Sequence, residues 1–96
     1  MACEQVGFGV IGTGVWGETH LKAYSWSPQI RLAAVCDTNE QLGRQRAEQY
    51  GAESFTTDYR ELLAHPGLQA VSVVTPDFLH REIAVAAAEA GKHILI

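Results

Sequence analysis

The stretch VGFGVIGTGVWGETH, residues 6–20, decides which fold the chain adopts. It opens with an unbroken apolar run, which is typical of a strand covered on both faces of a parallel sheet. A glycine-rich turn follows at once, and from Gly17 onward small and apolar residues recur at helical spacing. The stretch therefore predicts a strand, a tight glycine loop and a helix in direct succession.

The remaining chain repeats this alternation of strand and helix. Further apolar runs are expected to form strands at residues 31–36, 53–55 (the weakest), 70–74 and 93–96. Helical patterns fill the gaps between them, and glycines at 51 and 91 mark the ends of two helices. Strands joined by helices in this way form a parallel sheet with right-handed crossovers. The predicted fold class is therefore α/β, a doubly wound parallel sheet with a single domain over residues 1–96.

Two short segments have the form of helix starts. TNEQ, residues 38–41, is a capping-box pattern in which Thr38 would cap the helix and Gln41 would reach back. DYRE, residues 58–61, has a similar form and predicts a short helix that ends before Pro66. Both starts follow predicted strands, as the alternating pattern requires.

Composition excludes several classes of protein. The net charge is −4 and no run of Lys or Arg occurs, so nucleic acid is not an expected partner. No apolar stretch is long enough to span a membrane, and the N-terminus lacks the basic region of a signal peptide. Cys3 and Cys36 have no metal-ligand spacing, so no metal site is indicated and a reduced, cytoplasmic protein is expected.

The glycine loop fits the pattern G-x-G-x-x-G, with the residues Gly12, Thr13, Gly14, Val15, Trp16 and Gly17. Between a predicted strand and a predicted helix, this pattern indicates a dinucleotide cradle. Gly12 would permit the tight turn, Gly14 would let a pyrophosphate approach the backbone, and Gly17 would let the helix pack closely. The alternative is a plain turn. The Trp16 ring is compatible with packing or with a cover over the pyrophosphate.

Asp37 follows the second predicted strand, twenty residues after Gly17. A carboxylate at this place accepts hydrogen bonds from the adenosine ribose and repels a 2′-phosphate, which favours NAD over NADP. Arg44 or Arg46 on the next helix is close enough in sequence to offer a 2′-phosphate a partner. The alternatives for Asp37 are a solvated carboxylate and a helix cap that competes with Thr38.

Four segments together resemble the N-terminal domain of the Gfo/Idh/MocA oxidoreductases: GVIGTGVWGETHLKAY, AVCDTN, DYRELLAHPGLQAVSVVTPDFLH and AVAAAEAGKHILI. The resemblance covers nearly the whole chain, and T-P-x-x-x-H followed by A-G-K-H is its most specific part. It implies an NAD(P)-dependent dehydrogenase that transfers a hydride to or from a sugar, polyol or related carbohydrate. The resemblance assigns Thr75 and Pro76 to the loop beside the nicotinamide, and places His80 near the cofactor.

Asp77 departs from this resemblance, because the family often has Asn there. Its carboxylate is equally well explained as a helix cap. The resemblance also implies an E-K-P motif and a C-terminal α/β domain with the substrate pocket, neither of which occurs in these residues. We therefore expect a fragment of a longer, homo-oligomeric protein and assign no catalytic residue.

Rival functions have different signatures. A non-catalytic dinucleotide-binding regulatory protein would keep the glycine loop without turnover. A nucleotide enzyme that uses S-adenosylmethionine or FAD would share the fold, but the T-P-x-x-x-H and A-G-K-H pair argues against it. A purely structural domain would leave the glycine loop and Asp37 unexplained.

Overall fold

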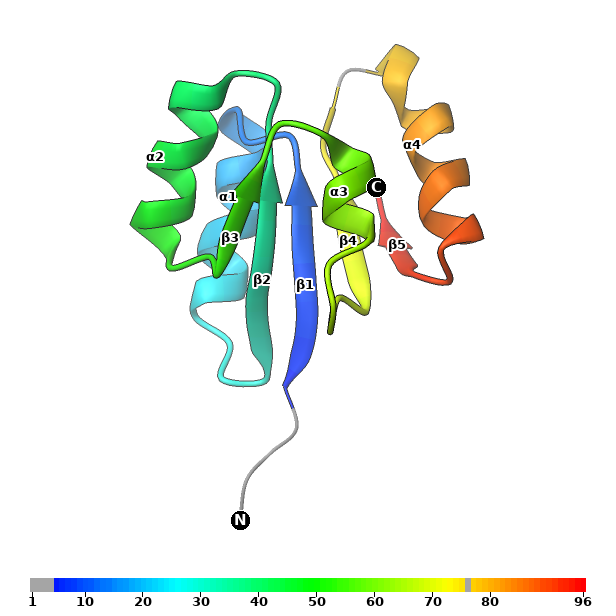
Figure 1. Cartoon of the computed structure of the whole chain (residues 1–96). Helices are drawn as coiled ribbons and strands as arrows, with labels where there is room; N and C mark the ends of the chain where they lie inside the picture. The colour runs from blue at the N-terminus through cyan, green and yellow to red at the C-terminus, as the bar shows by residue number, and fades with distance from the viewer. Residues whose placement is uncertain (1–4, 76) are drawn as a thin grey trace.

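The structure is a computed structural model that describes residues 5–75 and 77–96. Strands and helices alternate along the chain, as Figure 1 shows. In chain order they are β1 (Val6–Ile11), α1 (Val15–Ser25), β2 (Ile30–Cys36), α2 (Glu40–Tyr50), β3 (Ser54–Thr56), α3 (Tyr59–Leu63), β4 (Ala70–Val73), α4 (Asp77–Glu89) and β5 (His93–Leu95).

The five strands form one sheet in the order β3-β2-β1-β4-β5, and every pair is parallel. The chain moves outward from β1 in one direction to β3, then returns to the other side of β1 with β4. This reversal at β1 is the doubly wound arrangement, so the predicted fold class is confirmed. None of the helices in the described ranges is long and apolar enough to cross a membrane.

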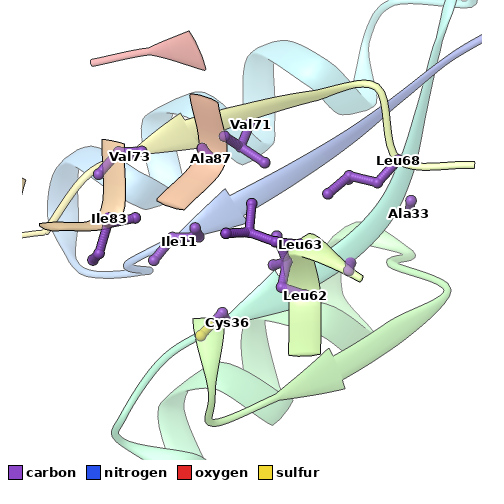
Figure 2. Packing of buried hydrophobic residues seen from close by; sticks show 11 residues of the cluster. Ile11, Ala33, Cys36, Leu62, Leu63, Leu68, Val71, Val73, Ile83 and Ala87 are labelled. Atoms are coloured by element: carbon purple, nitrogen blue, oxygen red, sulfur yellow. The ribbon is translucent and has the colours of Figure 1, made fainter. Parts of the chain in front are cut away.

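Side chains that alternate along the strands pack into two separate hydrophobic cores. On β1, Val10 packs with Leu21 of α1, whereas its neighbour Ile11 packs with Leu62 of α3 and Ile83 of α4. Successive strand residues point to opposite faces, so a continuous apolar strand is what two covered faces require. Figure 2 shows the core on the α3 and α4 side.

The strand bounds differ slightly from those expected. The second strand begins one residue early at Ile30, the third is Ser54–Thr56, and the fourth and fifth end one residue early at Val73 and Leu95. The weak candidate near residue 53 is therefore a real strand, although it has only three residues. It is held by pairing with β2 and by Phe55, which packs against the core on the α1 and α2 side.

The predicted cap of the second helix was wrong by one residue. Asn39, not Thr38, is the N-cap of α2, and its side-chain oxygen accepts a hydrogen bond from the Leu42 backbone N–H at 3.1 Å. The reason is Asp37, whose Oδ1 accepts from the Asn39 N–H at 2.8 Å and folds the chain into a local turn. That turn delays the helix start by one position. The short helix α3 has Asp58 as its N-cap.

Candidate functional site

A cavity of about 370 Å³ lies where the carboxyl ends of β1, β2 and β4 meet. The arrowheads of β1 and β2 in Figure 1 mark this edge of the sheet. Parallel α/β sheets bind ligands at this edge, where the strand order reverses. The cavity is lined by Ile11, Gly12, Thr13, Gly14, Cys36, Asp37, Thr38, Thr57, Tyr59, Val74, Thr75, Leu79 and Ile83.

The three glycines of the loop meet different surroundings. Gly12 has a φ of 96°, and a Cβ there would lie 2.6 Å from the Val74 carbonyl oxygen. A Cβ on Gly17 would collide with the Gly12 carbonyl oxygen, so α1 packs against the loop only because this residue lacks a side chain. A Cβ on Gly14 would meet nothing within 4 Å. Gly12 and Gly17 close the turn, whereas Gly14 borders open space.

The start of α1 differs from the starts of α2 and α3. Asn39 and Asp58 cap those two helices with side-chain oxygens. The N-cap of α1 is Gly14, and no side chain of the described residues caps this helix. The first backbone N–H groups of a helix have no partner within the helix, and they carry partial positive charge. An uncapped start beside a cavity is therefore suited to an anion.

Asp37 is tied to the glycine loop. Its Oδ2 accepts hydrogen bonds from the Thr13 backbone N–H at 2.9 Å and from the Thr13 hydroxyl at 2.6 Å. Thr13 is fully buried, so both bonds lie inside the fold. An ionised carboxylate offers about four acceptor positions, so these bonds and the one from Asn39 leave capacity for a ligand.

Behind the loop, α2 contacts α1 through an ion pair. Arg46 donates from Nη1 to Glu18 Oε2 at 2.9 Å and from Nε to the Thr13 carbonyl oxygen at 3.3 Å. The Tyr50 hydroxyl donates to the same Glu18 oxygen at 2.7 Å. That hydrogen bond, together with the positive charge of Arg46, lowers the pKa of the Glu18 carboxyl. Burial and the bond to Glu18 raise the pKa of the Tyr50 hydroxyl.

Two polar groups in the cavity wall carry information about its chemistry. The Thr75 hydroxyl oxygen is buried and has no hydrogen-bond partner in the described part of the chain. Such a group costs free energy unless a ligand or water binds it. Burial, reinforced by the adjacent Asp37 charge, raises the pKa of the Cys36 thiol to about 12. The thiol is therefore protonated and does not act as a nucleophile at neutral pH.

The structure brings five of the eleven sequence-predicted cofactor residues together at one cavity. Gly12, Thr13, Gly14, Asp37 and Thr75 all line the same cavity.

The other predicted residues are placed differently. Trp16 is 73% exposed on the first turn of α1, and neither Trp16 nor His80 appears among the described residues that line the cavity. The prediction for Pro76 lies outside the described residues, as do those for the side chains of Val15 and Asp77.

Several cavity residues were missed by sequence reasoning. Leu79 and Ile83 line the cavity from α4, although their helical spacing indicated core packing only. Thr57 and Tyr59 reach the cavity because they follow β3, whose carboxyl end lies beside that of β2. The available signal was positional, since residues just after neighbouring parallel strands share one edge of the sheet.

Comparisons with known proteins agree with this geometry. A family model described as an oxidoreductase family with an NAD-binding Rossmann fold matches residues 6–96. The chain is 36% identical to levoglucosan dehydrogenase of Pseudarthrobacter phenanthrenivorans, over 96% of this chain and 26% of that protein. It is 37% identical to scyllo-inositol 2-dehydrogenase (NAD(+)) of Bacillus subtilis, over 97% of this chain and 28% of that protein.

Solved structures show the same arrangement. GenD2 from gentamicin A biosynthesis, in complex with NAD, superposes with a TM-score of 0.91 at 32% identity, over 98% of this chain and 27% of its own. Levoglucosan dehydrogenase in complex with NADH gives a TM-score of 0.86 at 35% identity, over 95% of this chain and 27% of its own. The chain thus spans about a quarter of the length of these relatives. It belongs to the Gfo/Idh/MocA oxidoreductase family and has that family's NAD-binding Rossmann fold.

Proposed function

We propose that this chain binds NAD(H) in the cavity at the carboxyl ends of β1, β2 and β4. The observation that carries the proposal is the uncapped start of α1, which meets open space at Gly14. A helix start of this kind is a site for an anionic group. Because no atom lies within 4 Å of where a Gly14 Cβ would be, such a group can approach the backbone there. The pyrophosphate of a dinucleotide has the charge and the shape for this place.

Other cavity residues fit the rest of the cofactor. The Asp37 carboxylate has acceptor capacity for the adenosine ribose hydroxyls and would repel a 2′-phosphate, which favours NAD(H) over NADP(H). The buried Thr75 hydroxyl on the other side of β1 supplies a polar partner without an existing hydrogen bond in the described residues. We assign to NAD(H) the loop Gly12–Gly17 together with Asp37 and Thr75. Pro76, Asp77 and His80 stay predictions.

The bound nicotinamide supplies the hydride-transfer chemistry, and this chain supplies binding and orientation. Levoglucosan and inositol dehydrogenases are among its relatives, which supports a sugar, polyol or related carbohydrate as the substrate of the whole protein. Because the chain spans about a quarter of those relatives, we propose that residues 1–96 act as the dinucleotide-binding domain and that a second domain provides the substrate pocket. A cytoplasmic location and a homo-oligomer stay predictions.

Titration with NADH and NADPH tests the proposal. Calorimetric Kd values are to be compared for the wild type, Asp37→Ala, and Glu48→Ala on the exposed face of α2 as a control that also removes one negative charge. We expect the wild type to bind NADH more tightly than NADPH. Asp37→Ala should lower the affinity for NADH by about tenfold and reduce the difference between the two Kd values. Glu48→Ala should bind as the wild type does.

Two results would contradict the proposal. A folded wild type that binds neither nucleotide would remove the cofactor assignment. Binding of NADH without oxidation or reduction of any carbohydrate by the whole protein would favour the rival, a dinucleotide-binding regulatory protein.

A further inference from the structure

The Arg46 guanidinium lies behind the glycine loop and makes contacts that NAD(H) binding does not explain. Arg46 and Glu18 have side chains that are 19% and 25% exposed, whereas Arg44 and Glu40 on the same helix are 64% and 61% exposed. Exposed ion pairs contribute little to stability, but a partly buried pair with good geometry holds its partners in place. The two arginines are therefore in different physical situations although they are two residues apart.

The contact of Arg46 with Thr13 concerns the loop backbone directly. Its Nε donates to the Thr13 carbonyl oxygen, while the Thr13 N–H and hydroxyl donate to Asp37. The loop is thus held on one side by Asp37, just after β2, and on the other by Arg46 of α2. In a planar trans peptide the carbonyl and the next N–H point in opposite directions. A fixed Thr13 carbonyl therefore fixes the direction of the Gly14 N–H at the start of α1.

Glu18 keeps the guanidinium in the orientation that reaches the loop. Its Oε2 accepts from both Arg46 and the Tyr50 hydroxyl, so the carboxylate joins α1 to two positions of α2. The guanidinium has donors in a rigid planar fork, and here Nε and Nη1 together serve three acceptors: the Thr13 carbonyl, Glu18 and Gln49. A lysine ammonium at the same place has no such fork.

We propose that Arg46 is a positioning residue for the dinucleotide: it sets the shape of the Gly12–Gly17 loop and the anchoring of Asp37 through Thr13, without touching the cofactor. This inference rests on the proposed NAD(H) binding. It also argues against Arg46 as the partner of a 2′-phosphate, because its Nε and Nη1 donors are directed to the Thr13 carbonyl, Glu18 and Gln49.

The test measures Kd for NADH and NADPH in the whole protein. Arg46→Gln should lower the affinity for both nucleotides by the same factor, between about 10-fold and 100-fold. This is the effect expected when one hydrogen bond to a charged group is lost. Arg46→Lys should recover only part of this loss. Arg44→Gln, the matched control on the same helix, should leave the Kd for NADH unchanged, because its ion pair with Glu40 is exposed.

A double-mutant cycle separates positioning from general stability. If Glu18 holds Arg46 in the orientation that reaches the loop, then Arg46→Gln and Glu18→Gln should be non-additive in their effects on NADH affinity. Additive effects would overturn the inference. If Arg46→Gln does not fold, Glu18→Gln removes the same ion pair with little change of shape. This variant should also lower the affinity for both nucleotides.

The outcomes also separate this inference from the proposed function. A wild type that binds no NADH overturns both. A wild type that binds NADH, with Arg46→Gln and Glu18→Gln binding equally well, overturns only the role of Arg46. Loss of NADPH binding alone in Arg46→Gln would make Arg46 a direct contact of the 2′-phosphate and would overturn the positioning role.

Discussion

The two ends of the parallel sheet use glycine in opposite ways. At the amino end, Arg31 donates to the Gly67 carbonyl oxygen at 3.2 Å, and the Gly7 N–H donates to Gln69 Oε1 at 3.0 Å. At the carboxyl end, the uncapped start of α1 and the space at Gly14 border a cavity of about 370 Å³.

Glycines allow close approach of the backbone at both ends. The protein's own side chains satisfy the backbone at the amino end, whereas at the carboxyl end space remains for a ligand. A glycine by itself therefore does not indicate a binding site; the groups around it decide.

The largest effects are expected from two glycines whose missing side chains have no room. A Cβ on Gly17 would collide with the Gly12 carbonyl oxygen, and a Cβ on Gly7 with that of Gly67. Gly17→Ala and Gly7→Ala should each lower the free energy of unfolding by about 3 kcal/mol. Urea denaturation measures this loss.

NADH affinity then separates the two ends of the sheet. The fraction of Gly7→Ala that stays folded should bind NADH normally, whereas Gly17→Ala should lose binding by about 100-fold, because α1 must move away from the loop. An equal loss of NADH affinity in both variants would contradict the statement that only the carboxyl end of the sheet binds the ligand.

Gly14→Ala should separate binding from stability. A Cβ there meets nothing within 4 Å, so the free energy of unfolding should change by less than about 1 kcal/mol. The methyl group would occupy space that we assign to the pyrophosphate, and NADH affinity should fall by about tenfold. Calorimetric titration and urea denaturation of the same samples test both statements. Unchanged affinity would place the phosphates elsewhere.

Arg31→Met should sharpen the comparison from the amino end. This change removes the ion pair with Glu53, 3.2 Å long, and the hydrogen bond to Gly67 while it keeps most of the apolar stem. Because both charged side chains are partly exposed, the loss of unfolding free energy should be about 1 kcal/mol or less. NADH affinity should not change. A measurable change in Kd would show that the two ends are coupled through the sheet.

The smallest effect concerns pH. The pKa of Glu18 is lowered in the folded state, chiefly by the Tyr50 hydroxyl. A lowered folded pKa stabilises the protein at pH above the unfolded pKa, and this contribution is lost as pH falls through the folded value. Glu18→Gln should therefore lose less stability than the wild type between neutral and acidic pH, measured as urea midpoints. An identical loss in both would remove Glu18 from the acid response.

The sequence alone predicted the features that local pattern controls. Continuous apolar runs identified β1, β2 and β4, and the spacing of Gly12, Gly14 and Asp37 located the cavity. These features follow from the strand period, from backbone freedom and from the place of residues after a parallel strand.

Features that depend on contacts between distant segments were missed. Asn39 replaced Thr38 as the cap because Asp37 turns the chain first. Sequence spacing also does not show that Arg46 of α2 contacts Glu18 and the back of the loop. Leu79 and Ile83 serve the core and the cavity wall together, and helical periodicity detects only the first of these roles.

The central position of β1 has a consequence for the order of folding. Its pairing with β2 joins neighbouring segments, but its other edge pairs with β4, and Gly9 there lies opposite Val71. During synthesis, the first β-α-β unit emerges well before β4 is available. One edge of the first strand is therefore unpaired during this time. Unpaired strand edges promote association between chains. The second edge of β1 is therefore covered only after β4 has left the ribosome.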